Sequence, residues 1–272
     1  MEEVGYGVTA PAKGDEVYAM LDYGYDGAEA EFTIALPSEL APKPHKLDHV
    51  QAAAVPLSAL TAWQALFVHA SLAVGQTILI HGATGGVGVF AVQLAHWAGA
   101  RVIATASARN RDFLRELGAD EIIDYTTTRF EDVIHGVDFV FNTVGEDTLQ
   151  RSWQVFKPGG GPLSVVSPRP SFEETKAYDV RPVWFVVQPN REQLVQISAL
   201  IDERKGRPII DTVRPFPRHA RPTSKGRRAT REGRSSCVWW TRRIWELKLS
   251  LSTLRPPIRR RMTPAWTYLA CP

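Results

Sequence analysis

The chain has 272 residues, of which 44% are apolar and 22% are charged, and it contains two cysteines. This length can bury a large core in one or two domains, and the composition excludes collagen, a disulfide scaffold and wholesale disorder. No stretch approaches the roughly 20 uninterrupted apolar residues of a membrane span. The first residues lack the basic flank and apolar core of a secretory signal. We therefore expect a cytoplasmic protein.

The net charge of +3 hides two regions of opposite charge. Residues 1–213 carry 17 Lys and Arg against 27 Asp and Glu, whereas residues 214–261 carry 15 against two. Both cysteines and four of the eight tryptophans also lie beyond residue 213. The body and the tail therefore follow different compositional rules.

From residue 77 onward, short β-branched runs alternate with helical patterns. Residues 77–81 read as a buried strand, and Val87, Phe90, Ala91, Leu94, Ala95 and Ala98 then share one helix face. A strand over 101–105, a helix over 110–117 and strands over 121–125 and 138–141 follow, and a turn over 158–160 leads into a strand over 163–166. This alternation predicts right-handed crossovers and a parallel sheet, which is a doubly wound α/β (Rossmann) domain.

A glycine-rich turn separates the first of these strands from its helix. It reads Ala83-x-Gly85-x-x-Gly88, with alanine in place of the first glycine of the dinucleotide-binding fingerprint. Glycine lets the backbone approach a pyrophosphate, whose charge the helix N-terminus favours. The strand, turn and helix order favours dinucleotide binding over the alternative of a tight packing turn.

The end of the second strand indicates which dinucleotide binds. NAD-binding domains usually place an acid there for the ribose 2′-hydroxyl. Here residues 105–110 contain no acid, and the first acid after the strand is Asp112. The hydroxyl, guanidinium and amide of Ser107, Arg109 and Asn110 suit a 2′-phosphate instead. We predict NADP(H), with the alternative that Arg109 merely lies on a solvated helix start.

Ordered motifs over most of residues 1–217 resemble the medium-chain dehydrogenase/reductase superfamily. The similarity is to its zinc-free branch of quinone oxidoreductase-like enzymes and enone or enoyl reductases. The segments that carry the resemblance are 13–19, 52–63, 81–88, 117–120, 138–145, 157–160 and 184–187.

The resemblance implies contacts that spacing alone does not. The nicotinamide and pyrophosphate would be contacted by Thr61 and by the loop of Gly85, Gly86, Val87 and Gly88, and the adenosine phosphate would be surrounded by Ser107, Arg109, Asn110 and Tyr125. The nicotinamide would be lined by Thr143, Val144, Ser167, Phe185 and Val187. The predicted cofactor-binding set also includes Ala83, Thr84 and Asn142. Asn142 stands where the family often has Asp, a departure that we do not expect to prevent binding.

No metal site is predicted. A catalytic zinc needs three Cys, His or carboxylate ligands, and residues 1–213 contain no cysteine. His45 and His49 flank a short segment after two prolines and are expected to be solvated, and His81 is expected to be a packed neighbour of the glycine turn.

The resemblance also divides the chain into regions. We expect residues 1–47 to be a remnant of a catalytic β-barrel like chaperonin-10, truncated at its N-terminal side, so that no catalytic residue can be named. Residues 48–180 would form the NADP-binding Rossmann domain, 181–217 its end and the return to the catalytic domain, and 218–272 a disordered basic tail.

The basic tail has three alternative interpretations. It could be a solvated arm, or a basic arm whose arginines and tryptophans contact nucleic acid or an anionic membrane. The third is a shifted reading frame. Read one base out, Trp239-Trp240 forces Val and Trp240-Thr241 forces Asp, and the tail can spell the family's expected ending, with an allowed stop after it. We favour a frameshift near residues 217–219.

The expected activity, implied by the resemblance, is NADPH-dependent and zinc-independent reduction of a quinone or an α,β-unsaturated carbonyl or enoyl substrate. The alternative is a catalytically inactive dinucleotide-binding remnant, with a nucleic-acid-binding tail as an outsider. The expected partners are a small carbonyl or quinone substrate and, because zinc-free relatives are often dimers, a second copy of the chain. No membrane partner is expected.

Overall fold

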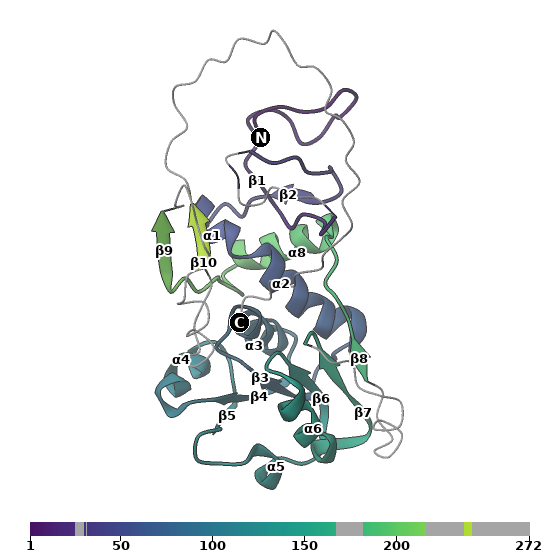
Figure 1. The fold of residues 1–272 in the computed structure, drawn as a ribbon, viewed down its shortest axis with the longest axis vertical. Coiled ribbons are helices and arrows are strands. Elements are labelled where there is room, and N and C mark those ends of the chain that lie inside the picture. The colour runs from purple at the N-terminus through teal and green to yellow at the C-terminus, as the bar shows by residue number, and fades with distance from the viewer. Residues whose placement is uncertain (25–29, 31, 167–181, 216–236, 241–272) are drawn as a thin grey trace, which may run out of the picture.

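The structure is a computed structural model that describes residues 1–24, 30, 32–166, 182–215 and 237–240 (Figure 1). Ser167, predicted to contact the nicotinamide, lies outside the described residues.

A six-stranded parallel sheet forms the centre of the cofactor-binding region. Its strands lie in the order β5-β4-β3-β6-β7-β8. They are β3 (Thr77–His81), β4 (Arg101–Ala106), β5 (Glu121–Asp124), β6 (Val137–Asn142), β7 (Phe156–Ser164) and β8 (Val183–Trp184). The chain builds outward from β3 to β5, returns to place β6 on the other side of β3, and continues outward to β8. This order confirms the predicted doubly wound α/β fold.

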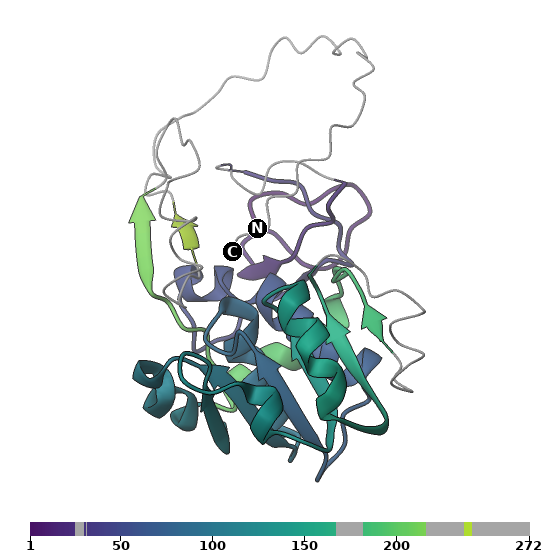
Figure 2. The ribbon, with the colours of Figure 1, turned by 60° about the horizontal axis from the view of Figure 1, so that its bottom comes forward.

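Helical segments cover both faces of the sheet (Figure 2). The helical segments of the described residues are α1 (His49–Ala53), α2 (Pro56–Trp63), the π-helical η1 (Gln64–His69), α3 (Gly86–Trp97), the 3₁₀ turn η2 (Ala108–Asn110), α4 (Arg111–Glu116), α5 (Phe130–Val133), α6 (Glu146–Arg151), the 3₁₀ turn η3 (Ser152–Val155) and α8 (Arg191–Asp202); α1 packs against β1 (Val17–Ala19) and β10 (Cys237–Trp240) and not against this sheet. Alternate residues of β3 separate the two cores. Ile78 and Ile80 join the larger cluster with α2, α3 and α8, whereas Leu79 joins a smaller one with α5 and η3.

The central part of helix α3 is buried on all sides, although the sequence predicts a single apolar face. Every residue from Gly88 to Ala95 is buried. The reason is that α3 lies between α2 and the strands β3 and β4. An edge-to-face contact of Trp63 with Phe67, at 4.7 Å between ring centroids, and a stacked contact of Trp63 with Trp97 close the end of this packing.

Strand β7 differs from the prediction of a turn over 158–160 followed by a strand over 163–166. The structure has one strand from Phe156 to Ser164, with a register shift against β6. Gly159 adopts φ +80°, and a Cβ on Gly160 would lie 2.8 Å from the carbonyl oxygen of Asp138. The glycines that looked like a turn therefore let an irregular strand approach its neighbour closely.

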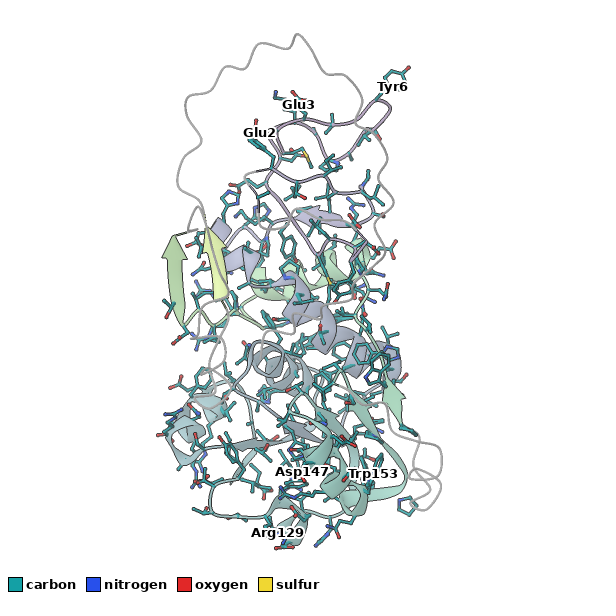
Figure 3. All side chains as sticks on the ribbon, in the orientation of Figure 1. Glu2, Glu3, Tyr6, Arg129, Asp147 and Trp153 are labelled. Carbon is teal, nitrogen blue, oxygen red and sulfur yellow. The ribbon has the colours of Figure 1, made fainter. Side chains whose placement is uncertain are left out.

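The N-terminal region contributes a two-stranded antiparallel sheet of β1 (Val17–Ala19) and β2 (Leu40–Pro42). The buried hydroxyl of Tyr18 donates to the carbonyl of Leu194 at 2.7 Å and lies 2.8 Å from Ser198 Oγ, which ties β1 to α8. Figure 3 shows Glu2, Glu3 and Tyr6 at the opposite end of the molecule from Arg129, Asp147 and Trp153. The barrel-like catalytic domain and the domain boundaries remain predictions.

Strand β9 (Thr212–Pro215) pairs in parallel with β10 (Cys237–Trp240). We expected no regular structure after residue 217, and this short strand differs from that expectation. Valine and tryptophan are favoured in strands, which accounts for pairing at Val238 to Trp240. The rest of the basic tail lies outside the described residues.

Candidate dinucleotide-binding site

The site lies where the strand order reverses, at the carboxyl ends of β3 and β6. His81 pairs with Asn142 at the last step of these two strands. Beyond it, the hydroxyl of Thr143 donates to the carbonyl oxygen of His81 at 2.9 Å. In open α/β sheets, ligands bind in the crevice outside this switch point.

The glycine turn has the shape that a pyrophosphate requires. Gly82 adopts φ +72°, and a Cβ there would overlap Thr143 Oγ1. A Cβ on Gly88 would overlap the carbonyl oxygen of Gly82 and lie 2.7 Å from the Cα of Ala83. Gly85 is the N-cap of α3 and has no side chain to accept the first N–H groups of the helix. The turn therefore presents backbone N–H groups and a helix N-terminus to an anion, and the residues present fit a dinucleotide phosphate.

Asn142 shapes the turn that follows β6. Its buried amide donates to the carbonyl of Gly145 at 2.8 Å, and its oxygen accepts from the backbone N–H of Val144 at 3.1 Å. An ionised aspartate at this position could accept the second of these bonds but could not donate the first. The departure from the family's usual Asp thus leaves a well-ordered turn, which presents Thr143 and an exposed Val144 beside the glycine turn.

The predicted contacts of the adenosine phosphate meet at one corner of the sheet. Ser107 follows β4, and Tyr125 follows β5 and donates its N–H to the carbonyl of Ala106 at 3.3 Å. The buried amide of Asn110 donates to Ser107 Oγ at 3.1 Å. Arg109 and Tyr125 are exposed at this corner.

Besides the turn after β6, the predicted nicotinamide contacts come from α2 and from the segment after β8. Thr61 is buried in α2 and donates its hydroxyl to the carbonyl of Leu57 at 2.6 Å. Phe185 and Val187, which follow β8, are buried as well.

Sequence reasoning missed Gln64, which fixes the segment after β8. Its side-chain nitrogen donates to the carbonyl of Gln188 at 2.8 Å, and its oxygen accepts from the N–H of the same residue at 3.0 Å. A glutamine inside an apolar helix carries no signal of a partner 124 residues away in the chain. The pairing holds the backbone just beyond Val187.

His81 is a packed neighbour of the glycine turn, as the sequence suggested. Its ring is buried, with Nδ1 3.0 Å from Thr105 Oγ1 and Nε2 3.2 Å from Ser152 Oγ. Ser152 Oγ donates to the carbonyl of Thr148, so it accepts from Nε2–H of His81. Burial, reinforced by the Arg151 charge, lowers the pKa of His81 to about 3. This ring therefore cross-links β3, β4 and η3 and does not exchange protons near neutral pH.

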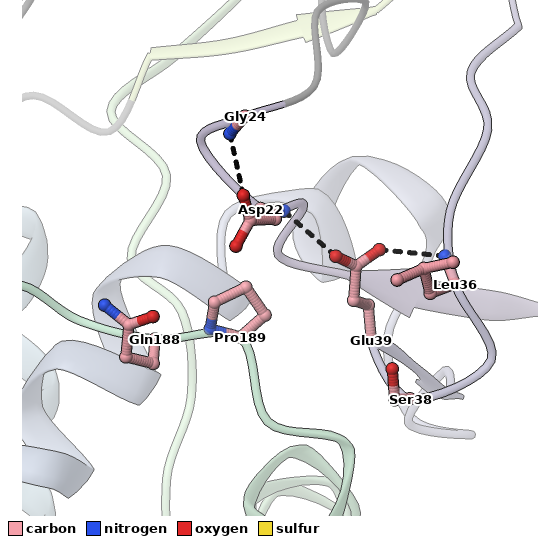
Figure 4. Close-up of a pocket in the computed structure, with 7 residues that line it drawn as sticks. All are labelled: Asp22, Gly24, Leu36, Ser38, Glu39, Gln188 and Pro189. Carbon is pink, nitrogen blue, oxygen red and sulfur yellow. Dashed lines mark hydrogen bonds between the residues drawn. The ribbon is translucent and has the colours of Figure 1, made fainter.

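A hollow of about 580 Å³ lies beside the segment after β8. Its lining includes Gln188, Asp22 and Glu39 (Figure 4). The carboxylate of Glu39 accepts backbone N–H bonds from Asp22 and Leu36 at 3.1 and 2.9 Å, and Asp22 accepts one from Gly24. The acids of this hollow thus stabilise local turns and are not poised as a catalytic pair.

Within the described part of the chain, no group of three or more His, Cys, Asp or Glu side chains is arranged to hold a metal ion. Nor does any helix in those residues have the length and apolarity to cross a membrane.

The parallel sheet and its glycine cradle define a dinucleotide-binding domain, and comparisons with known proteins extend this class. A family described as "Zinc-binding dehydrogenase" matches residues 117–222. The chain is 35% identical over 230 residues to a probable mitochondrial zinc-binding oxidoreductase of Arthroderma benhamiae, covering 78% of this chain and 69% of that protein. It is 35% identical over 226 residues to a chloroplastic NADPH-dependent alkenal/one oxidoreductase of Arabidopsis thaliana, covering 79% of this chain and 55% of that protein.

The fold comparison agrees. The structure of the quinone oxidoreductase from Coxiella burnetii matches with a TM-score of 0.72 and 34% identity, over 79% of this chain and 68% of that one. The chain belongs to the medium-chain dehydrogenase/reductase superfamily, among its quinone oxidoreductase-like and enoyl reductase homologues. It is an oxidoreductase that uses a nicotinamide dinucleotide.

Proposed function

We propose that the chain binds NADPH and reduces a quinone or an α,β-unsaturated carbonyl compound without zinc. The observation that carries this proposal is the glycine cradle at the switch point, where any Cβ on Gly88 would overlap backbone. The relatives' printed names, a quinone oxidoreductase and an alkenal/one oxidoreductase, support the substrate class.

The preference for the 2′-phosphate rests on the end of β4. No acid follows this strand within η2, and Ser107 and the exposed Arg109 occupy the turn. A guanidinium and a hydroxyl complement a phosphate better than a ribose hydroxyl. Arg111 adds a further positive charge at the start of α4.

The cofactor supplies the hydride, and the protein supplies binding and orientation. The N-terminus of α3 would hold the pyrophosphate through Gly85 and its neighbours. The turn set by Asn142 would hold Thr143 and Val144 beside the nicotinamide, and the buried side chains of Phe185 and Val187 would give the ring apolar neighbours. None of the predicted nicotinamide contacts is a side chain that titrates near neutral pH, so these residues orient and shield the ring.

The test is NADPH oxidation with a panel of quinones and enones, before and after treatment with a metal chelator. Turnover that survives the chelator is expected. Because Gly85→Ala crowds the phosphate turn, it should raise the KM for NADPH about ten-fold or more, whereas Asp147→Asn, an exposed carboxylate outside the predicted cofactor contacts, should leave it unchanged.

Binding without turnover would instead favour a dinucleotide-binding remnant. NADPH would then quench tryptophan fluorescence, but no compound of the panel would be reduced. Loss of activity on chelation would contradict zinc independence, a point of interest because both the matching family and the Arthroderma relative carry zinc in their printed names.

We also propose a cytoplasmic location and a homodimer. The Arthroderma and Arabidopsis relatives are named mitochondrial and chloroplastic, so cell fractionation is the test of location. Sedimentation of the purified chain over a range of concentrations tests the dimer.

A further inference from the structure

Asp124 places a carboxylate beside the predicted adenosine-phosphate contacts. It comes from β5, whereas the usual acid of a dinucleotide-binding sheet follows the second strand, which is β4 here. It is the last residue of β5 and pairs with Ala106, the last residue of β4. Its Oδ2 accepts the backbone N–H of Ala108, at the start of η2, at 3.2 Å. The turn after β4, which lacks an acid of its own, is therefore held by an acid from the neighbouring strand.

This carboxylate is fixed in position and in charge. Its Oδ1 accepts both the backbone N–H of Thr126 at 2.9 Å and the hydroxyl of the same residue at 2.6 Å. The hydrogen bonds from Thr126 come first among the causes that lower the pKa of Asp124. The side chain is therefore an anion at neutral pH, and Oδ2 can accept one further hydrogen bond.

The ribose 2′ position of a dinucleotide bound to such a sheet lies at the end of the second strand, which is β4 here. Two features of Asp124 act on that position. Its negative charge repels a 2′-phosphate, and it occupies the N–H of Ala108 that a phosphate could otherwise use. The remaining acceptor capacity of Oδ2 suits a ribose hydroxyl. The positive charges of Arg109 and Arg111 act in the opposite direction.

We propose that Asp124 is a specificity-determining residue that limits the preference for NADPH over NADH. This inference rests on the proposed cofactor site and adds a residue that the usual position of the acid would not reveal. It means that the chain accepts both dinucleotides, with the phosphate preference of Arg109 and Ser107 offset by Asp124.

The experiment measures dissociation constants by calorimetry for adenosine 2′,5′-bisphosphate and for adenosine 5′-monophosphate, together with those of NADPH and NADH. These ligands are bound in the absence of substrate, so the readout does not depend on turnover. The test variant is Asp124→Asn, with Asp124→Ser as a second uncharged variant if the first does not fold.

Asp120→Asn is the matched control. Asp120 precedes β5, and its carboxylate also accepts a backbone N–H of β4, that of Val102, at 2.7 Å. It lies at the amino end of the strands, away from the proposed ribose. The control thus removes the same charge and a similar hydrogen bond at the wrong end of the sheet.

We expect Asp124→Asn to bind the bisphosphate about three to ten times more tightly relative to the monophosphate, because one nearby exposed charge is removed. The ratio of NADPH to NADH affinity should rise likewise, and the difference from wild type should shrink as salt is added. Asp120→Asn should leave both ratios unchanged.

An unchanged ratio in Asp124→Asn (or in Asp124→Ser, where the asparagine variant does not fold), or the same change in Asp120→Asn, would overturn the inference while leaving the proposed function intact. Failure of the wild-type chain to bind any of the four ligands would overturn the proposed function, and the inference with it.

Discussion

The two glycines that close the phosphate turn are expected to fail in different ways when a methyl group is added. In Gly88→Ala, the Cβ would overlap the carbonyl oxygen of Gly82 and lie 2.7 Å from two backbone atoms of Ala83. Neither neighbour is a flexible side chain that could move aside. Helix α3 must therefore shift away from β3, and the phosphate turn shifts with it.

The size of the effect follows from the position of Gly88 in the buried first turn of α3. Overpacking a core costs about 1–3 kcal/mol, and we place this clash at about 3 kcal/mol because backbone must move. Replacing glycine by alanine in a helix returns about 1 kcal/mol. The net loss of about 2 kcal/mol should lower the melting temperature by about 4–8 °C in a chain of this size.

Gly85→Ala is the control, because Gly85 already has φ −76°. A Cβ there would have only the carbonyl oxygen of Gly82 close by, at 3.3 Å. An alanine N-cap costs about 0.5–1 kcal/mol, so the fold should persist. The methyl group nevertheless stands where the backbone must approach the pyrophosphate, and NADPH binding should weaken at least about ten-fold, or by roughly 1.4 kcal/mol.

Thermal unfolding and NADPH titration of both variants provide the assay. Gly88→Ala should lose about 2 kcal/mol of stability together with binding, whereas Gly85→Ala should lose binding with a stability cost of no more than about 1 kcal/mol. Wild-type stability in Gly88→Ala, or a larger stability loss in Gly85→Ala, would refute this explanation of the turn.

Three further predictions concern buried polar groups. Burial lowers the pKa of His81 to about 3, so on acidification the unfolded chain takes up a proton at this residue before the folded chain does. The free energy of unfolding should therefore fall as the pH drops below about 6.5, by up to about 1.4 kcal/mol per pH unit. Denaturant titrations between about pH 7.5 and pH 5 should show a shallower fall in His81→Gln. Glu131→Gln removes the buried partner of two arginines and should lower the free energy of unfolding in urea by about 2 kcal/mol, a value discounted because both arginines are partly exposed. Asp147→Asn removes an exposed ion pair with Arg151 at 3.9 Å and should cost almost nothing, so equal costs would contradict the prediction. Tyr18→Phe breaks two buried bonds to α8 and should cost about 1–2 kcal/mol, which the exposed Tyr23→Phe should not reproduce.

Local sequence patterns determined most of the fold. The β-branched run before Gly82 and the glycine turn after it specify a strand and a helix start, because sterics and burial act on neighbouring residues. The alternation of such units then specifies a parallel sheet, since crossovers have a fixed hand. The phosphate cradle could be predicted for the same reason, as all its glycines lie within one turn.

The tertiary structure alone decided what distant residues do at this edge of the sheet. Gln64 meets Gln188, and Asp124 meets Ala108, because the packing of α2 and the order of the strands bring them together. The sequence shows that no acid follows β4, and only the pairing of β4 with β5 shows that an acid arrives there from the side. Periodicity reports which face of an element is buried, but contacts between elements depend on register and strand order, which no local pattern encodes.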